Sequence, residues 1–391
     1  MTSSNEKNVM TRLPELDALR GLAAMSVVIF HSKNNLYPNA SWWSWGYLCV
    51  DLFFIISGVV LTITYENRIL TRETGFARFL RARFARMAPM HWAVLLATAG
   101  CYFYILDFSV HARAIFPWDA TLYGFVLSAL FLQGVGLIQH HTWNAIAWSI
   151  SAEMIVNVLW FSLLRSGKSS TRVIAGIVAV STVVLFEGWG KSHEYRIDTY
   201  YDVIYSFLST GILRCIIGFC IGILIARHLI NGSKIRDLGL LVANILSVSV
   251  IGAMTVLICY HDDPAFSAID YVAIIFILPS LVISCLARRS LIHRILQLRV
   301  LMWLGTRSYS LYILHGLVIL MTPFVLYWFG ITRISSPWLG VIDIGAALVL
   351  SEITYRTIEM PFRSLFRGDL GKRSWMHSSQ GSQKNHETAR L

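Results

Sequence analysis

LDALRGLAAMSVVIFH, residues 16–31, is apolar enough to enter a membrane, and yet it contains Asp17, Arg20 and His31. An ionised side chain in hydrocarbon costs at least about 2.5 kcal/mol, so such residues usually face a protein interior and line a functional path. At about 100° per residue, the helix from Arg20 to His31 makes three turns and about 20° more, which places both side chains on one face. Asp17 lies about 40° to the other side of His31. The segment therefore predicts a membrane helix with an acid, a base and an imidazole along one stripe.

The chain as a whole has the composition of a polytopic membrane protein. Of its 391 residues, 55% are hydrophobic and 14% are charged, whereas charged residues make up about 25% of a soluble protein. The net charge is +11, but the basic residues cluster between apolar runs and indicate membrane topology, so we expect no nucleic-acid partner. The 6 cysteines lack Cys-x-x-Cys or Cys/His metal spacing, and neither a disulfide framework nor a metal site is expected.

Apolar runs of spanning length recur through the chain and predict an all-α, polytopic membrane helical bundle of about ten transmembrane helices. The ranges predicted to span are 16–36, 47–65, 84–106, 145–164, 172–189, 204–226, 238–260, 268–287, 300–329 and 338–358. A further apolar run at 121–139 contains several glycines and Gln133. It is predicted to be a re-entrant or interfacial segment that is buried on protein.

If the run at 121–139 does not cross the membrane, the basic clusters all fall on one side. The positive-inside rule then places both termini in the cytoplasm. The few basic residues left on the outer side are Lys33, Arg113, Lys191, Arg196 and Arg333. The chain is thus predicted to consist of a cytoplasmic tail at 1–12, a membrane domain at 13–367 and a polar, disordered cytoplasmic tail at 368–391.

A series of arginines in GFARFLRARFARMAPMHW, residues 75–92, lies at the inner mouth of the third predicted span. Arg83 and Arg86 are three residues apart, so they share a helix face and are suited to grip phosphates with bidentate donors. The alternative is that these arginines only set the topology, an interpretation that applies most to Arg78 and Arg81. Arg86 lies inside the apolar run, which favours a functional role.

Polar residues also follow a helical period in HTWNAIAWSISAEMIVNVLWF, residues 141–161. Ser149, Glu153 and Asn157 occur at i, i+4 and i+8 and form a polar stripe. We expect Ser149 and Asn157 to make helix-packing hydrogen bonds. Glu153 is the candidate for a functional role, because an acid inside a membrane span needs a partner.

Two further predicted spans contain ionisable residues, Arg214 and His315, and the role of each can be interpreted in two ways. Arg214, in STGILRCIIGF, either pairs with a buried acid to hold helices together or belongs to the functional site. Ser308, Tyr312 and His315 share one helix face in GTRSYSLYILHG. His315 either bonds a backbone carbonyl or takes part in catalysis.

In this order and spacing, the motifs resemble the bacterial acyltransferase family 3, integral membrane enzymes that O-acylate cell-surface and exported glycans. LDALRGLAAMSVVIFH is similar to the first helix of that family, with an arginine, ten residues and a histidine, here Arg20 and His31. FLRARFARMAPMHW is similar to the family's RxxR motif, here Arg83 and Arg86.

AWSISAE resembles the family's WSLSVEE segment, with Glu153 at the first acid and Met154 in place of the second. VDLFFIISGVVL, YSLYILHG and IEMPFR are similar to other motifs of the family, so the resemblance runs from about Leu13 to Arg363. Some members append a periplasmic hydrolase-like domain, which we do not expect in a chain of this length.

The resemblance implies a cytoplasmic acyl-CoA as donor, with acetyl-CoA expected, and a glycan or lipid-linked sugar hydroxyl as acceptor. The acceptor class would be an exopolysaccharide, a lipopolysaccharide or a lipo-oligosaccharide, and the location the bacterial inner membrane with its lipids. No bound cofactor is expected. The candidate residues are His31, Arg20, Glu153 and Asp17 for catalysis, Arg83 and Arg86 for acyl-CoA binding, and Ser149, Tyr312, His315 and Arg214 for the substrate pocket.

His31 has the chemistry for the central step, because a neutral imidazole can take a proton from a sugar hydroxyl or carry the acyl group itself. Asp17, Arg20 or Glu153 would fix its tautomer or stabilise developing charge. The alternative function is a transporter or flippase of a glycan or glycolipid, since buried Arg, Glu and His also form proton relays. We find no convincing internal repeat of the kind that many transporters carry.

Overall fold

The structure is a computed structural model. It describes residues 13–37, 43–108, 120–138, 140–188, 190, 202–204, 208–230, 234–331 and 334–364. The predicted tails at 1–12 and 368–391 lie outside the described residues. So do four of the predicted outer basic residues, namely Arg113, Lys191, Arg196 and Arg333.

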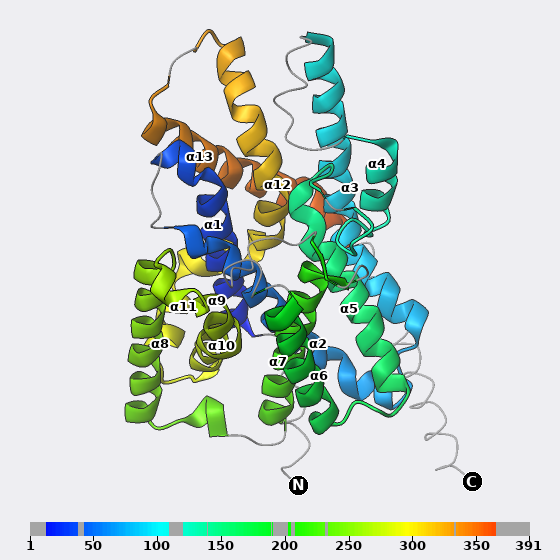
Figure 1. The fold of residues 1–391 in the computed structure, drawn as a ribbon, viewed down its shortest axis with the longest axis vertical. Coiled ribbons are helices and arrows are strands. Elements are labelled where there is room, and N and C mark those ends of the chain that lie inside the picture. Colours follow the sequence, from blue (N-terminus) through cyan, green and yellow to red (C-terminus); the bar gives the residue numbers. More distant parts are fainter. Residues whose placement is uncertain are drawn as a thin grey trace, which may run out of the picture.

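The described chain is a bundle of α-helices, as predicted (Figure 1). The main helices are α1 (Pro14–Leu36), α2 (Cys49–Leu70), α3 (Phe76–Phe108), α4 (Leu122–Ala129), α5 (Trp148–Arg165), α6 (Thr171–Gly188), α7 (Thr210–Ile230), α8 (Leu240–Tyr260), α9 (Ile269–Val272), α10 (Leu278–Leu286), α11 (Leu291–Leu296), α12 (Arg299–Trp328) and α13 (Ser336–Thr354). The short 3-10 or π segments are η2 (Ser44–Leu48), η4 (Ala145–Ala147), η6 (Lys234–Asp237), η7 (Pro264–Phe266), η8 (Ala273–Ile277) and η9 (Tyr355–Glu359). Two-residue strands β1 (Val203–Ile204) and β2 (Leu208–Ser209) pair antiparallel.

Among the described residues, 8 helical segments are long and apolar enough to cross a membrane. They are Ser44–Leu70, Ala145–Arg165, Thr171–Gly188, Thr210–Ile230, Leu240–Tyr260, Ile269–Leu286, Arg299–Trp328 and Ser336–Ser364. The other two ranges predicted to span fall on α1, of 23 residues, and α3, of 33 residues. The prediction of an all-α polytopic membrane bundle is therefore confirmed.

The run at 121–139 does not form a spanning helix. Its helix α4 has 8 residues, about 12 Å at 1.5 Å per residue, which is too short to cross a bilayer. Turns follow, with positive φ at Phe131 and Gly136. This agrees with the prediction that the run does not cross, but the run is only partly buried on protein, because Leu122, Tyr123 and Leu130 are 78%, 58% and 59% exposed.

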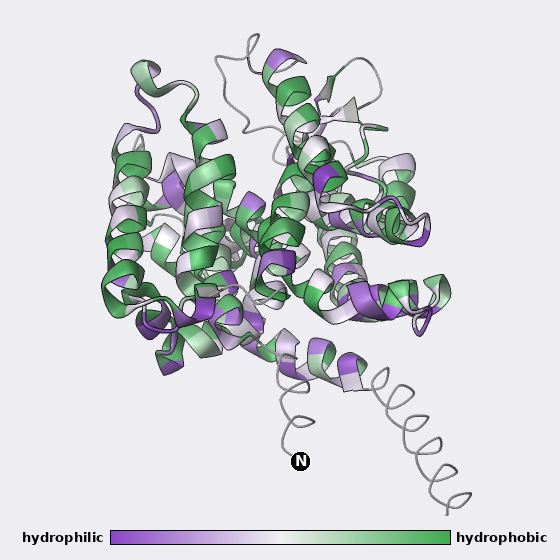
Figure 2. Cartoon of the chain, turned by 90° about the horizontal axis from the view of Figure 1, so that it is seen from below, coloured by the Kyte–Doolittle hydropathy of each residue, from purple (hydrophilic) through white to green (hydrophobic). Residues whose placement is uncertain are grey.

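The outer surfaces of the bundle are apolar, as a lipid environment requires. Leu241 and Val248 on α8 are 73% and 63% exposed, and Val349 on α13 is 61% exposed. Figure 2 shows hydrophobic residues along most of the helices and hydrophilic residues mainly at helix ends and connections. Side chains that would stay buried in a soluble protein can face lipid here.

Helices α1 and α12 cross at a pair of glycines. A Cβ atom on Gly21 would lie 2.5 Å from the backbone nitrogen of Gly305, and a Cβ on Gly305 would collide with the carbonyl of Asp17. The two backbones therefore touch, an approach that only small residues allow. Ten residues further along each helix lie His31 and His315, whose rings meet. The glycine crossing thus sets the level at which the two imidazoles face each other.

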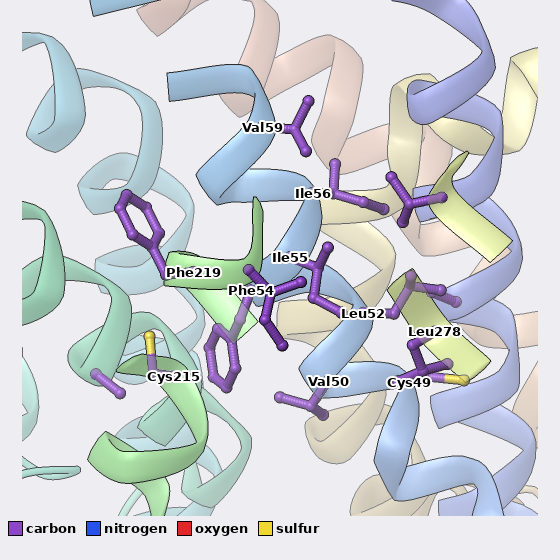
Figure 3. Packing of buried hydrophobic residues seen from close by; sticks show 14 of the residues in the cluster. Cys49, Val50, Leu52, Phe54, Ile55, Ile56, Val59, Cys215, Phe219 and Leu278 are labelled. Carbon is purple, nitrogen blue, oxygen red and sulfur yellow. The ribbon is translucent and has the colours of Figure 1, made fainter. Parts of the chain in front are cut away.

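Helices α2 and α7 make a second close crossing. A Cβ on Gly58 would collide with the carbonyl of Phe219, and a Cβ on Gly222 with the carbonyl of Ile55. Figure 3 shows the buried side chains on either side of this crossing, with Phe54 from α2 near Cys215 and Phe219 from α7. This crossing holds the α2 and α7 backbones in register, so polar groups on the two helices can pair inside the core.

Candidate active site

His31 and His315 form a hydrogen-bonded pair between α1 and α12. The Nε2 atom of His315 lies 3.2 Å from Nδ1 of His31. His315 Nδ1 lies 2.6 Å from the Tyr312 carbonyl, and His31 Nδ1 lies 3.0 Å from the Val27 carbonyl. Because a carbonyl only accepts, a proton on each Nδ1 satisfies these contacts, and the single His31 Nδ1–H is then shared between the Val27 carbonyl and His315 Nε2. The bonding pattern therefore assigns the proton of neutral His31 to Nδ1 and leaves a lone pair on Nε2.

The two imidazoles differ in their access to substrate. His315 is completely buried, whereas His31 is exposed although its neighbours Val27 and Val28 are buried. Phe30 packs edge-on against the His31 ring, with centroids 4.9 Å apart. A buried His315 therefore orients an accessible His31, which is the arrangement that a general base needs.

The partners of His31 differ from those expected from the sequence. The sequence suggested that Asp17, Arg20 or Glu153 would fix its tautomer, but its described partners are Val27, His315 and Phe30. Arg20 lies eleven residues back along α1, about 16 Å at 1.5 Å per residue. The charged side chains that act electrostatically on Arg20 are Arg86, Glu153, Asp17 and Arg83. Both residues lie on the continuous helix α1, at the axial separation expected from the sequence, but the sequence did not identify His315 as the partner of His31.

Arg83 is enclosed in a buried ion pair. Its Nη2 donates to Glu153 Oε1 at 2.9 Å, and the exposed fractions of the two side chains are 5% and 11%. Ser57 Oγ donates to the same carboxylate oxygen at 2.9 Å. Glu153 therefore accepts from one N–H of Arg83, whose Nε has no partner among the described residues, and the role of Arg83 in phosphate binding stays a prediction. Sequence spacing placed Arg83 beside Arg86 but did not reveal the acid opposite.

Arg86 lies among arginines from three helices. It acts electrostatically on Arg20 of α1, Arg83 of the same helix and Arg363 near the end of the chain's last described helix. Arg363 pairs with Glu359 at 2.5 Å. Among the interactions of the described residues, neither Arg20 nor Arg86 has an ion-pair or hydrogen-bond partner for its side chain, and both are half-buried. The cluster therefore has positive charge in excess, which attracts anions.

Sequence reasoning missed Arg363 as a member of this cluster. It lies in the IEMPFR segment, which was noted as a motif but assigned no role. Glu359, four residues earlier, also accepts a hydrogen bond from Ser310 Oγ at 2.5 Å. This bond ties the end of the last helix to α12, so Arg363 is held near Arg86.

Three of the four candidate pocket residues come together. Ser149 Oγ lies 2.8 Å from the Tyr312 hydroxyl. Tyr312 also donates to the Ile146 carbonyl at 3.2 Å, so its hydroxyl accepts from Ser149. The Tyr312 ring lies 5.8 Å from that of His315. This polar group adjoins the imidazole pair.

Arg214, the fourth candidate, pairs with Asp51 of α2. Its Nη2 donates to Oδ2 at 2.6 Å and its Nε to Oδ1 at 3.1 Å. The side chains are 1% and 0% exposed, and the guanidinium also lies over the Trp148 ring at 5.4 Å. Of the two interpretations made from the sequence, the structure supports the pairing of helices.

These features define a class: a polytopic helical membrane protein with an accessible histidine that adjoins a buried polar group, and with a cluster of arginines further along the same bundle. Comparison of the sequence with protein families is consistent with that class. A family model described as an acyltransferase domain matches residues 13–356. The chain belongs to this acyltransferase family.

Several curated proteins are similar over nearly the whole chain. A putative peptidoglycan O-acetyltransferase of Bacillus subtilis is 23% identical over 388 residues, which covers 93% of this chain and 57% of that protein. The peptidoglycan O-acetyltransferase of Listeria monocytogenes is 23% identical over 376 residues, 90% of this chain and 56% of that protein. A putative O-acetyltransferase of Staphylococcus aureus is 24% identical over 367 residues, 90% of this chain and 58% of that protein. The chain thus spans less than two thirds of these relatives, and no solved structure matches it.

Proposed function

We propose that this protein is a membrane O-acyltransferase that moves an acyl group, in particular acetyl, from cytoplasmic acyl-CoA to a hydroxyl of a glycan. The observation that carries the proposal is the His31–His315 pair, which leaves a lone pair on an accessible His31 Nε2. The family supports acyl transfer, and the names of the relatives favour a cell-surface glycan such as peptidoglycan as acceptor.

In the proposed reaction, His31 Nε2 takes the proton of the sugar hydroxyl as the hydroxyl oxygen attacks the thioester carbonyl. A C–O bond forms and the C–S bond breaks. CoA leaves as a thiolate and takes the proton from the His31 imidazolium, so the base is restored. His315 holds the ring through its acceptor Nε2 and keeps the His31 lone pair directed away from itself.

The donor phosphates would bind at the arginine cluster. Arg86 and Arg20 are the members without a described partner, whereas Glu153 accepts from one N–H of Arg83 and Glu359 pairs with Arg363. Because the cluster lies about 16 Å along α1 from His31, the phosphates and the thioester would be bound at different levels. The pantetheine arm would bridge them.

Replacing Arg86 tests the donor site. Arg86→Ala should weaken acyl-CoA binding by about tenfold or more, because it removes a charged hydrogen bond worth about 1.5–3 kcal/mol. Arg86→Lys should recover affinity only partly, since lysine lacks the bidentate guanidinium. Affinity is measured by isothermal titration of the purified protein, with exposed Arg81→Ala as matched control. Equal affinities of Arg86→Ala and Arg81→Ala would assign Arg86 to topology alone.

The fate of the acyl donor distinguishes the proposed acyltransferase from a transporter. Inside-out vesicles that contain the protein are incubated with acetyl-CoA labelled in the acetyl group. An acyltransferase consumes the thioester and transfers the label to a glycan. Mass spectrometry of surface glycans from strains with and without the gene would identify that glycan. A transporter or flippase leaves the thioester intact.

The proposed topology, with both termini in the cytoplasm of the bacterial inner membrane, rests on the positions of the basic clusters. Reporter fusions after Arg72, Lys168 and Arg289 should report cytoplasm. Fusions after Arg113 and Arg196 should report the periplasm. A periplasmic signal from a fusion at Lys384 would contradict the proposed topology, because the chain would then cross the membrane an odd number of times.

A further inference from the structure

The last helix of the described chain, Ser336–Ser364, ends against α3. Its first part, α13, packs on α1 and α12, whereas the π segment η9, which follows, packs on α12 and α3. Figure 1 shows this end of the described chain close to α3. The last helix therefore reaches the helix that carries Arg83 and Arg86.

The π segment η9 changes the direction of the side chains that follow it. The N–H of Met360 donates to the carbonyl of Tyr355, five residues back, and the next residue, Pro361, has no N–H to donate. A π turn holds more residues than an α turn, so the side chains after it do not continue the face of α13. Such turns often occur at functional sites. Glu359 and Arg363 can thus face α12 and α3.

Glu359 fixes Arg363 in place. The Glu359 side chain is 1% exposed, and its Oε1 forms an ion pair with Arg363 Nη2 at 2.5 Å. Arg363 follows Glu359 by four residues, so the two side chains share a helix face. Ser310 Oγ of α12 donates to the other oxygen, Oε2. The carboxylate is therefore anchored to α12 on one side and holds the guanidinium on the other.

Arg363 remains open to an anion although it is paired. Its side chain is 36% exposed, whereas that of Arg83 is 5% exposed. A guanidinium has five N–H donors, and among the described residues the one ion-pair partner of Arg363 is Glu359. Donors are therefore left over on a side chain that a solute can reach.

Two neighbouring residues of α12 bring Arg363 and Arg86 together. The Tyr309 hydroxyl donates at 2.5 Å to the carbonyl of Met87, which directly follows Arg86. Ser310, the next residue, holds Glu359 and through it Arg363. The two arginines act on each other electrostatically. Like charges held close repel each other, and an anion bound between them relieves that repulsion.

We infer that Arg363 is a further donor-site residue, which binds a phosphate of CoA together with Arg86. This inference rests on the proposed function. A phosphate has several acceptor oxygens, and arginine can engage two of them at once. The last helix and α3 would then hold the nucleotide end of the donor from two sides.

The test is competition of three ligands against radiolabelled acetyl-CoA on the purified protein, in detergent without added lipid. The ligands are CoA, 3′-dephospho-CoA and pantetheine. Arg363→Ala should weaken CoA binding by at least about tenfold, because it removes a charged hydrogen bond. Pantetheine, which has no phosphate, should bind as it does to the wild type. With 3′-dephospho-CoA, a retained fall identifies the diphosphate as the partner and a lost fall the 3′-phosphate, and either result supports the inference.

A second pair of variants covers the case in which Arg363→Ala does not fold, because that change leaves Glu359 buried without its partner. Glu359→Gln removes the acid and keeps an oxygen that can accept from Ser310. The double variant Glu359→Gln with Arg363→Ala should bind CoA at least about tenfold more weakly than Glu359→Gln alone. This comparison isolates the guanidinium of Arg363.

Arg356→Ala is the matched control, because it removes the same charge from the same helix. The Arg356 side chain is 71% exposed and pairs with Glu352, so its loss should leave CoA affinity at the wild-type value. Equal CoA affinity with and without Arg363, an equal fall for pantetheine, or the same fall in Arg356→Ala would each overturn the inference.

A lipid headgroup is the other source of a phosphate at this helix end. An effect of Arg363→Ala that appears only in vesicles containing phosphatidylglycerol, and not in lipid-free detergent, would assign Arg363 to the lipid and overturn the inference. Failure of the proposed function is distinguishable, because the wild-type protein would then bind no acetyl-CoA or transfer no label from it.

Discussion

His31→Gln should lower acyl transfer by about 10²–10⁴-fold, the usual contribution of general-base catalysis. Glutamine keeps the approximate size of the side chain but cannot accept and then return a proton at neutral pH. Acyl-CoA affinity should survive, because Arg20, the member of the arginine cluster that lies on α1, is about 16 Å from His31 along the helix. Transfer of label from acetyl-CoA to glycan in vesicles and acyl-CoA titration of the purified protein measure the two quantities.

The matched control is His293→Gln on α11, where the histidine Nδ1 donates to the Cys285 carbonyl at 2.7 Å outside the site. It should keep transfer near the wild-type rate. Kinetics also distinguish a base from an acyl carrier: an acyl-imidazole on His31 gives ping-pong kinetics, whereas a general base needs both substrates at once. We favour the base. A folded His31→Gln protein with wild-type transfer would contradict both mechanisms and make Glu153 the next candidate.

The fold could be predicted from local sequence because a helix must be about twenty residues long to cross the hydrocarbon core of a bilayer. Each apolar run of about twenty residues must be a helix if it spans, and each run predicted to span contains a helix, although the run at 204–226 begins at the short strands before α7. The short α4 followed from the glycines in 121–139 and from the distribution of basic loops. Arg20 and His31 also lie on one continuous helix, α1, as the pattern predicted.

The partners inside the site could not be predicted because they lie on other helices. His315 is 284 residues from His31, and the contact depends on the crossing of Gly21 with Gly305. A periodic pattern gives the direction of a side chain but not the helix that it meets. For the same reason the sequence did not reveal that Arg83 pairs with Glu153.

Breaking the Arg214–Asp51 pair should destabilise the protein more than any other single change considered. Both side chains are almost completely buried, at 1% and 0% exposure. Removing one partner of a buried ion pair leaves an uncompensated charge, which typically costs about 3–5 kcal/mol. Arg214→Met and Asp51→Leu should each lower the midpoint of thermal unfolding in detergent and reduce the amount of protein recovered from membranes.

The double variant, with Arg214→Met and Asp51→Leu together, separates a structural role from a catalytic one. Replacing both charges with apolar side chains removes the uncompensated charge, and such exchanges are often neutral or stabilising. The double variant should therefore recover most of the stability that either single variant loses, and it should transfer acyl groups, because the guanidinium of Arg214 is occupied by Asp51. A stable double variant without transfer would instead place Arg214 in the catalytic machinery, next to Trp148 at the start of α5.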